Sequence, residues 1–173
     1  SMDFAGKPLS LEVSKLADQA DGAVFGRYGD TTVLATVVMG SKDKDANYFP
    51  LSVNYEEKFY AAGKILGSRF MRREGRSSDD AILSGRLIDR TIRPLFNQAI
   101  RREVQVVVTV LTFDGQNDPD FIGLLAASTA IAISPIPWGG PVAGVKAVKM
   151  SAKGGSASGG KGNFEVKINP TFS

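Results

Sequence analysis

The strongest strand pattern in this chain is Glu103-Val104-Gln105-Val106-Val107-Val108-Thr109-Val110-Leu111-Thr112-Phe113. β-Branched side chains dominate it, and they favour strands because they pack well on a pleated surface. Its apolar run is nearly continuous, which is typical of a strand that is covered on both faces. The segment therefore predicts a strand buried on both sides.

Shorter strand patterns lie on both sides of this segment. Before it, they cover residues 9–16, 23–28, 31–39 and 49–55. Gly29-Asp30 separates two of these patterns and predicts a hairpin turn. After it, strand patterns cover residues 142–150 and 164–168. Because strands dominate both ends and two helices are expected between them, we predict an α+β fold with helices packed on a mostly antiparallel sheet.

The first expected helix begins at Ser77-Ser78-Asp79-Asp80 and ends before Pro94. Ser77 and Asp80 have the spacing of a capping box, and a residue that precedes proline disfavours the helical conformation. At 100° per residue, two faces separate. The face expected to be buried carries Leu83, Leu87, Thr91 and Leu95, and the roughly opposite face carries Arg86, Arg90 and Arg93. The second expected helix, residues 121–133, is apolar almost all round, which predicts a buried helix.

The composition narrows the chemistry. The 173 residues suffice for one domain with a real core, and they include no cysteine and no histidine. This excludes disulfides, thiolate nucleophiles, Cys- or His-ligated metals and Ser-His-Asp catalysis. No apolar run approaches the roughly 20 residues that cross a bilayer, and no signal peptide pattern opens the sequence. We therefore expect no membrane partner.

The charge is unevenly distributed. The whole sequence has a formal net charge of +3, but residues 64–102 hold ten basic and four acidic side chains. Nine of those ten basic residues are arginine. Arginine forms bidentate pairs with phosphate and keeps its charge when buried. The local excess therefore indicates a polyanionic partner.

Two groups of residues in this basic region are candidate binding residues. The first predicts a grip on single-stranded RNA, by stacking and phosphate contacts, and comprises Phe70, Met71, Arg72, Arg73 and Arg76. Its alternative is a solvated basic loop. The second predicts an anion- or phosphate-binding helix face and comprises Arg86, Arg90 and Arg93. Its alternative is a face that pairs with acids such as Asp89.

Three further features have structural interpretations. Asp114, Asp118 and Asp120 could form a metal cluster, but turn formation around Pro119 explains them better. Trp138, between prolines and glycines, is expected to pack in a turn. Residues 153–162 are rich in Gly and Ser and predict a mobile hairpin loop.

A series of motifs in a fixed order resembles one family. They include Tyr60-Ala61-Ala62-Gly63-Lys64, Phe70-Met71-Arg72-Arg73-Glu74-Gly75-Arg76, Arg86-Leu87-Ile88-Asp89-Arg90-Thr91-Ile92-Arg93-Pro94, Asn117-Asp118-Pro119-Asp120, Ile136-Pro137-Trp138-Gly139-Gly140-Pro141 and Asn169-Pro170-Thr171. Together they resemble the first RNase PH-like domain of the polynucleotide phosphorylases. The match covers the whole sequence except the Gly/Ser-rich insert. Residues 3–173 would then form that domain, incomplete at its C-terminus, with the RNase PH-like (ribosomal protein S5 domain 2-like) fold.

The resemblance implies a function for the full-length protein. It would be a processive 3′→5′ phosphorolytic exoribonuclease that degrades RNA, including mRNA, with inorganic phosphate to nucleoside diphosphates, aided by Mg²⁺ or Mn²⁺. The catalytic acids belong to the family's second RNase PH-like domain, so this half would contribute RNA binding and trimer ring assembly. We therefore assign no catalytic and no metal-binding residue to these 173 residues, and expect them to be inactive and to bind no cofactor by themselves. The implied partners are single-stranded RNA, two further copies of the protein and other RNA-degradation proteins. The implied location is the bacterial cytoplasm, with an organellar source as the alternative.

One motif departs from the family pattern, and two other functions remain as alternatives. The usual Phe-Phe-Arg-Arg is Phe70-Met71-Arg72-Arg73 here, so Met71 offers a base less stacking area. The first alternative is a non-catalytic RNA-binding or ring-building subunit. The second is a single-domain RNase PH that acts on tRNA 3′ ends, which would require an acidic catalytic pair that the sequence does not present.

Overall fold

The structure is a computed structural model, and it describes residues 1–13, 15–65, 67, 77–151 and 164–169. Its strands are β1 (Met2–Phe4), β2 (Lys7–Val13), β3 (Gly22–Tyr28), β4 (Thr31–Asp43), β5 (Leu51–Glu57), β6 (Arg102–Thr112), β7 (Ala147–Ser151) and β8 (Phe164–Ile168). Its helices are α1 (Asp79–Ile92) and α2 (Pro119–Ile133), with 3₁₀ turns η1 (Phe59–Ala62) and η2 (Arg93–Leu95). The fold is α+β, as the sequence predicts.

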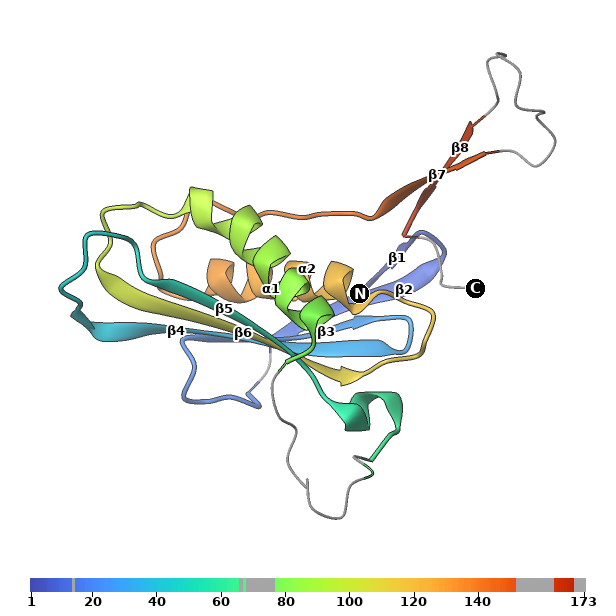
Figure 1. Cartoon of the computed structure of the whole chain (residues 1–173), viewed down its shortest axis with the longest axis horizontal. Helices are drawn as coiled ribbons and strands as arrows, with labels where there is room; N and C mark the ends of the chain where they lie inside the picture. The colour runs from blue at the N-terminus through green and yellow to red at the C-terminus, as the bar shows by residue number, and fades with distance from the viewer. Residues whose placement is uncertain (14, 66, 68–76, 152–163, 170–173) are drawn as a thin grey trace.

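Six strands form the main sheet in the order β1-β2-β3-β4-β6-β5. Neighbours from β1 to β6 pair antiparallel, whereas β5 pairs parallel to β6 and is an edge strand. Both helices lie on the same side of this sheet (Figure 1). α2 packs over β3, β4 and β6, whereas α1 packs over β5. A parallel β5–β6 pair needs a crossover connection, and α1 provides it.

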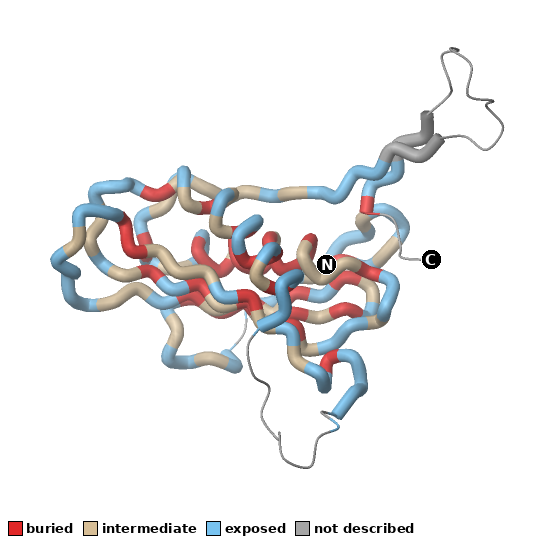
Figure 2. Tube along the Cα trace, viewed as in Figure 1, coloured by how far each residue is buried: buried red, intermediate tan, exposed pale blue. Residues whose placement is uncertain are grey.

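The strand at residues 103–113 is correctly predicted, but its burial is not. Within β6, Val104, Val106, Val108 and Val110 are buried, while the alternate residues are half-buried or exposed (Figure 2). The reason is that the helices cover one face of the sheet only, so the period-2 alternation decides which side chains they bury. A continuous apolar run alone did not reveal this one-sided cover.

α2 lies close to the sheet because β3 has glycine at two of the positions that the helix crosses, Gly22 and Gly26. A Cβ at Gly22 would lie 2.4 Å from the Ala130 carbonyl oxygen, so only glycine permits this approach. The helix is buried almost all round, as its apolar composition predicts, and its fully buried side chains include Ile122 and Ile131. α2 and the sheet therefore form the centre of the core.

The face that α1 buries differs from the expected one. Leu83 and Leu87 are 60% and 54% exposed, whereas the residues turned to the sheet are Ala81, Ser84, Gly85, Ile88 and Ile92. Small side chains let the helix approach β5 closely, and this close packing outweighs the larger apolar area of the two leucines. The helix also begins one residue later than predicted, since Ser78 rather than Ser77 accepts a hydrogen bond from the Ala81 amide (3.0 Å).

The segment after α2 leaves the main body. Trp138 packs beside Phe96 and donates its indole N–H to the Ile92 carbonyl (3.3 Å), so it is a packed turn residue. β7 and β8 then form a separate two-stranded sheet that extends away from the helices (Figure 1). The predicted mobile loop at residues 153–162 lies outside the described residues. Within the described ranges, neither helix is long and apolar enough to cross a membrane.

Candidate functional site

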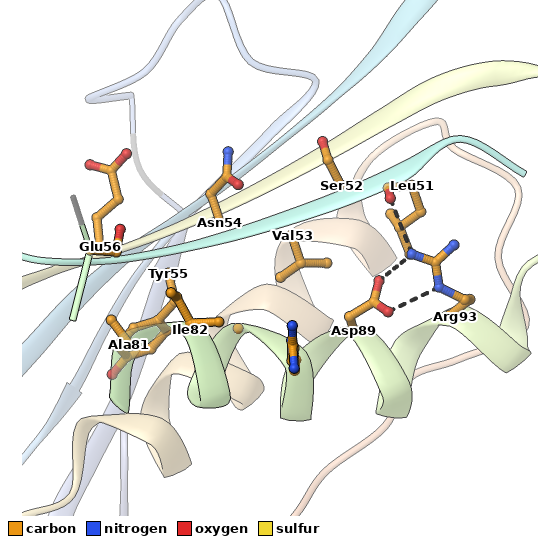
Figure 3. A pocket seen from close by; sticks show the side chains of 13 residues that line it. Leu51, Ser52, Val53, Asn54, Tyr55, Glu56, Ala81, Ile82, Asp89 and Arg93 are labelled. Carbon is orange, nitrogen blue, oxygen red and sulfur yellow. Dashed lines mark hydrogen bonds and ion pairs between the residues drawn. The ribbon is translucent and has the colours of Figure 1, made fainter. Parts of the chain in front are cut away.

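A groove of about 460 Å³ runs between the edge strand β5 and helix α1 (Figure 3). β5 contributes residues 51–56, and α1 contributes Ala81, Ile82, Gly85, Arg86 and Asp89. Arg93 and Ser77 complete the lining at its ends. The groove is thus a mixed surface, lined by apolar side chains such as Val53 and Ile82 and by polar or charged ones such as Asn54, Arg86 and Asp89.

The alternation along β5 explains this mixture. Ser52, Asn54 and Glu56 point to one side of the strand, whereas Val53 and Tyr55 point towards α1 (Figure 3). Residues 49–55, which the sequence predicts as a strand, already show this alternation of polar and apolar side chains. The polar residues that line the groove could therefore have been found from the sequence. That these polar residues line a groove depends on β5 being an edge strand, which the sequence pattern did not indicate.

Arg93 has a structural role at one end of the groove. Its guanidinium forms a two-point pair with Asp89, with Nη2–Oδ1 at 2.6 Å and Nε–Oδ2 at 3.0 Å. The same group donates to the carbonyl oxygen of Leu51 (3.1 Å) and, at 3.4 Å, to that of Phe49. Arg93 therefore fastens the end of α1 to the start of β5, which is the alternative interpretation of this residue.

Arg86 and Arg90 are placed differently. Both side chains are exposed, and Arg86 lines the groove. Within the part of the protein that the structure describes, neither guanidinium forms an ion pair. The first two arginines of the predicted helix face are therefore exposed and form no ion pair among the described residues, whereas the third pairs with Asp89.

The predicted RNA grip cannot be compared with the structure in the same way. Phe70, Met71, Arg72, Arg73 and Arg76 lie outside the described residues, so their role stays a prediction from the sequence. Ser77, which follows Arg76 directly, lines the groove. The predicted grip is therefore continuous in sequence with this site.

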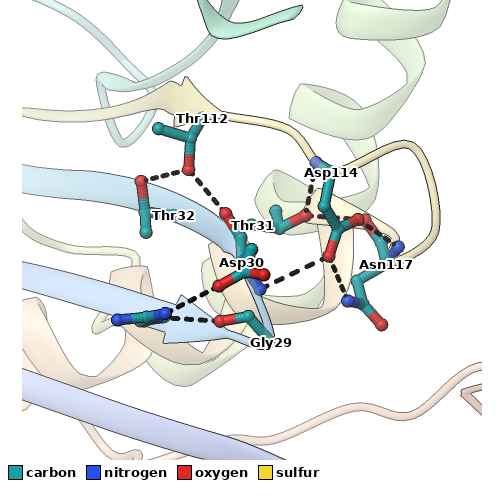
Figure 4. Close-up of polar contacts among 8 residues, drawn as sticks. Gly29, Asp30, Thr31, Thr32, Thr112, Asp114 and Asn117 are labelled. Atoms are coloured by element: carbon teal, nitrogen blue, oxygen red, sulfur yellow. Dashed lines mark hydrogen bonds and ion pairs between the residues drawn. The ribbon is translucent and has the colours of Figure 1, made fainter.

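Asp114 holds the loop between β6 and α2 together (Figure 4). One Asp114 carboxylate oxygen accepts the backbone N–H groups of Gln116 (2.7 Å) and Asn117 (2.8 Å). The Thr31 hydroxyl donates to the Asn117 carbonyl oxygen at 3.2 Å. Gly29 completes the contact, because its φ of +60° and a distance of 2.4 Å between a Cβ there and Asn117 exclude a side chain. These bonds join the β3–β4 turn to the loop.

Asp118 and Asp120 serve the start of α2. Asp118 caps the helix by accepting the Asp120 amide (3.0 Å), and it pairs with Lys146 at 2.6 Å. Asp120 accepts a hydrogen bond from the Ser84 hydroxyl (2.9 Å) and so links α2 to α1. Within the described ranges, no three acidic residues are grouped so that they could hold a metal ion. The turn interpretation therefore accounts for Asp114 and Asp118, whereas Asp120 connects the two helices.

Burial perturbs two titratable groups beside this link. Burial raises the pKa of Asp120, although the hydrogen bond from Ser84 acts against the shift. Burial also raises the pKa of Tyr55, and the nearby Asp120 carboxylate adds to it. The pKa of Asp114 is lowered, because hydrogen bonds from Asn117, Gln116 and Thr31 together outweigh the opposing effect of burial.

The chain belongs to the 3′ exoribonuclease family, whose first domain (RNase PH) matches residues 5–137. Two solved structures share the fold. They are the crystal structure of rice Rrp46, with a TM-score of 0.64 over 95% of this chain and 69% of that one, and the Archaeoglobus fulgidus exosome with RNA bound to the active site, with a TM-score of 0.59 over 95% and 66%. At 16% sequence identity, both show the RNase PH-like fold alone.

Curated relatives are more specific. Proteins named polyribonucleotide nucleotidyltransferase match this protein in Exiguobacterium sibiricum (50% identity over 100% of its residues) and in Thermus thermophilus (52% over 90%). The same name is given to a relative in Thermomicrobium roseum (49% over 99%). The chain spans only about a fifth of the length of these relatives, 22%, 21% and 20% respectively.

Proposed function

We propose that this chain is the first RNase PH-like domain of a phosphorolytic 3′→5′ exoribonuclease, and that it holds single-stranded RNA rather than cleaving it. The observation that carries the proposal is the pair of exposed arginines on α1, Arg86 and Arg90, which form no ion pair among the described residues. Relatives about 50% identical to it are named polyribonucleotide nucleotidyltransferase, which supports a polyribonucleotide as the bound polyanion.

A phosphate-binding role agrees with the chemistry of the site. Guanidinium groups bind phosphate oxygens at two points and remain charged in any environment. Since phosphate itself is the nucleophile in phosphorolysis, no histidine base is needed to activate water, and the sequence has none. The contribution of this domain would be to position the RNA strand for an active site in another domain of the full-length protein.

Mg²⁺ or Mn²⁺, which the family resemblance implies for the full-length enzyme, does not fit the described residues. No three acidic residues among those described are grouped so that they could hold a metal ion, and Asp114, Asp118 and Asp120 each accept hydrogen bonds from protein groups. We therefore route no step through a metal in this domain. The partners proposed for the full-length protein are RNA, two further copies in a trimer and other RNA-degradation proteins, in the bacterial cytoplasm.

The test is the salt dependence of RNA binding. Each phosphate contact on a single strand contributes a slope of about 0.7 in log affinity against log salt. Replacing both Arg86 and Arg90 by alanine should therefore flatten the slope by up to about 1.4 and weaken binding at low salt. Arg27→Ala is the matched control, since it removes an exposed arginine that pairs with Asp30 in the β3–β4 turn. A double variant with the parent slope would contradict the proposal.

The same measurement applies to the predicted grip. Arg72→Ala with Arg73→Ala should also flatten the slope by up to about 1.4. A parent-like slope would mean that these two arginines do not touch RNA.

Catalysis provides a separate test. The 173-residue chain, incubated with poly(A), inorganic phosphate and Mg²⁺, should release no nucleoside diphosphate, because its sequence presents no acidic catalytic pair. Release by this domain alone would favour the single-domain RNase PH alternative. RNA binding without activity in the full-length protein would favour the non-catalytic subunit.

A further inference from the structure

Exposed aromatic residues gather at one turn of the molecule. Within the described ranges four aromatic residues are exposed, and three of them, Phe59, Tyr60 and Phe113, lie at or beside η1. Apolar residues that are exposed singly are normal on a protein surface, whereas a group of large ones indicates a binding surface. We call these three residues the aromatic turn surface.

Backbone hydrogen bonds fix this turn to the end of β6. The Phe113 amide donates to the Ala61 carbonyl oxygen at 2.8 Å, and Ala61 itself is buried. η1 and the end of β6 therefore lie side by side (Figure 1). Gly63 closes the turn in the left-handed conformation, and its amide donates to the Tyr60 carbonyl oxygen at 3.0 Å. The backbone that presents the rings is thus held in place by the protein, which lowers the entropic cost of binding a ligand.

The directions of the rings suit successive units of a strand. A 3₁₀ turn has about three residues per revolution, so the side chains of Phe59 and Tyr60 leave it about 120° apart. Phe113 reaches the same place from the end of β6. Among the described residues, no other aromatic ring stacks on Tyr60 or Phe113. Rings that point in different directions can each receive a separate flat group.

The charge beside the turn favours an anionic strand over an apolar protein partner. Lys64 follows the turn as the first residue of the basic region 64–102, and its side chain is exposed. Glu56, near the end of β5, is paired with Lys58 at 3.1 Å. Proteins that bind single strands without sequence preference combine such a positive surface with aromatic side chains on which bases stack. The turn presents both features.

We propose that the aromatic turn surface is a base-stacking platform for single-stranded RNA. This rests on the proposed function, because the strand is the RNA that the domain holds. It goes further by assigning a contact to the bases, whereas the arginines of α1 would contact phosphates. Because every base has a flat face, the contact tolerates any sequence.

Tyr60→Ala in the 173-residue chain tests the platform, since Tyr60 is the most exposed of the three residues, at 56%. The probes are an eight-nucleotide oligo(A) and a ribose-phosphate strand of equal length without bases. Affinity for oligo(A) should fall about 5- to 150-fold, the effect of losing one stacked base. Affinity for the strand without bases should stay that of the parent. The slope of log affinity against log salt should also stay unchanged, because no charge is lost.

Tyr48→Ala is the matched control. Tyr48 is 68% exposed and precedes β5, so it lies at the opposite end of that strand from η1. This variant should keep the parent's affinity for both strands. Both tyrosines are exposed, so the melting temperature of each variant should stay close to that of the parent.

Two further substitutions at Tyr60 test the kind of contact. Tyr60→Phe keeps the ring and should keep the affinity for oligo(A). Tyr60→Leu keeps apolar area without a flat ring and should lose affinity. Loss in Tyr60→Phe would assign the contact to the hydroxyl group, and full affinity in Tyr60→Leu would assign it to apolar area alone. Either result would overturn stacking.

The outcomes separate this inference from the proposed function. Parent affinity in Tyr60→Ala, with a flatter salt slope in the Arg86 and Arg90 double variant, would overturn the platform and leave the proposed function standing. Lost affinity in Tyr60→Ala, with a parent slope in the double variant, would support the platform and contradict the role of the two arginines. Failure of the parent to bind RNA would overturn both. A changed oligomeric state in Tyr60→Ala with parent affinity would assign the surface to contact between copies and overturn the platform.

Discussion

The two helices cover the same face of one sheet, yet they have different roles. α2 crosses the middle of the sheet, is buried almost all round and uses its aspartates to close its own N-terminus. α1 lies over the edge strand, buries small side chains and keeps two arginines and two leucines exposed. The difference indicates that the position of a helix over the sheet decides whether it serves as scaffold or forms part of a candidate binding surface. A helix over the centre completes the core, whereas a helix over the edge strand leaves a groove beside it.

The largest expected effect is on the scaffold helix. Ile122→Ala removes a fully buried side chain that packs over Gly26 of β3, and should cost about 2–5 kcal/mol of unfolding free energy. Leu87→Ala on α1 should change it by less than about 0.5 kcal/mol, because that side chain is exposed. Urea unfolding of both variants measures the contrast. Similar losses in the two variants would mean that the outer face of α1 is covered in solution.

A second comparison lies within α1 and the turn that follows it. Arg93→Ala removes the two-point pair with Asp89 and the bonds to two carbonyls at the start of β5, so it should cost about 1–2 kcal/mol. Arg86→Ala should leave the unfolding free energy within about 0.5 kcal/mol and act on RNA binding instead. Arg93→Lys keeps the charge but not the two-point geometry, and should recover little of the loss. Full recovery by lysine would show that charge alone matters there.

The N-terminal cap of α1 should have a smaller effect. Ser78 accepts the Ala81 amide and donates to Glu57 at 2.9 Å, which ties the helix start to the end of β5. Ser78→Ala should cost about 1 kcal/mol, and Ser77→Ala, one residue earlier, should be close to neutral. Thermal unfolding of the two variants distinguishes them. A larger loss for Ser77→Ala would restore the capping position that the sequence spacing predicts.

The smallest expected effects concern pH, and they have opposite signs for two aspartates. The folded pKa of Asp120 is raised above 3.8, so the folded state binds its proton more tightly, and this contribution is lost as pH rises from 3.8 through the folded pKa. The folded pKa of Asp114 is lowered below 3.8, so its contribution is present above 3.8 and is lost as pH falls through the folded pKa.

Asparagine at each position tests these signs. Relative to the parent, Asp120→Asn should gain unfolding free energy as pH rises from 3.8 through the folded pKa of Asp120. Asp114→Asn should lose it as pH rises from the folded pKa of Asp114 to 3.8, with no further change above that pH. Denaturant unfolding from about pH 2 to about pH 7, which brackets the range in which aspartates titrate, gives both curves. Curves of the same sign would mean that burial does not govern Asp120.

Local patterns predicted much of the fold. The β3–β4 hairpin, the buried helix α2 and the strand β6 follow from periodicity and turn residues, which act over a few positions of the sequence. The short β1 was not predicted, because three residues contain too little pattern. For the candidate site, composition located the arginine-rich region and the spacing placed Arg86, Arg90 and Arg93 on one helix face. Spacing could not show that Arg93, unlike the other two, is held by hydrogen bonds, because two of its acceptors are carbonyl oxygens at the start of β5, far away in the sequence.

The sequence by itself determined the element types, the absence of histidine and cysteine chemistry, and the basic character of residues 64–102. Only the tertiary structure decided which face of α1 is buried, because the helix offers two apolar stripes and propensity does not choose between them. The choice fell to Ala81, Ser84 and Gly85, whose small size lets α1 approach the edge of β5. With this face packed against β5, Leu83 and Leu87 are exposed and Arg86 lines the groove. The packing distance between a helix and a strand depends on both elements, and the sequence pattern of α1 describes only one of them.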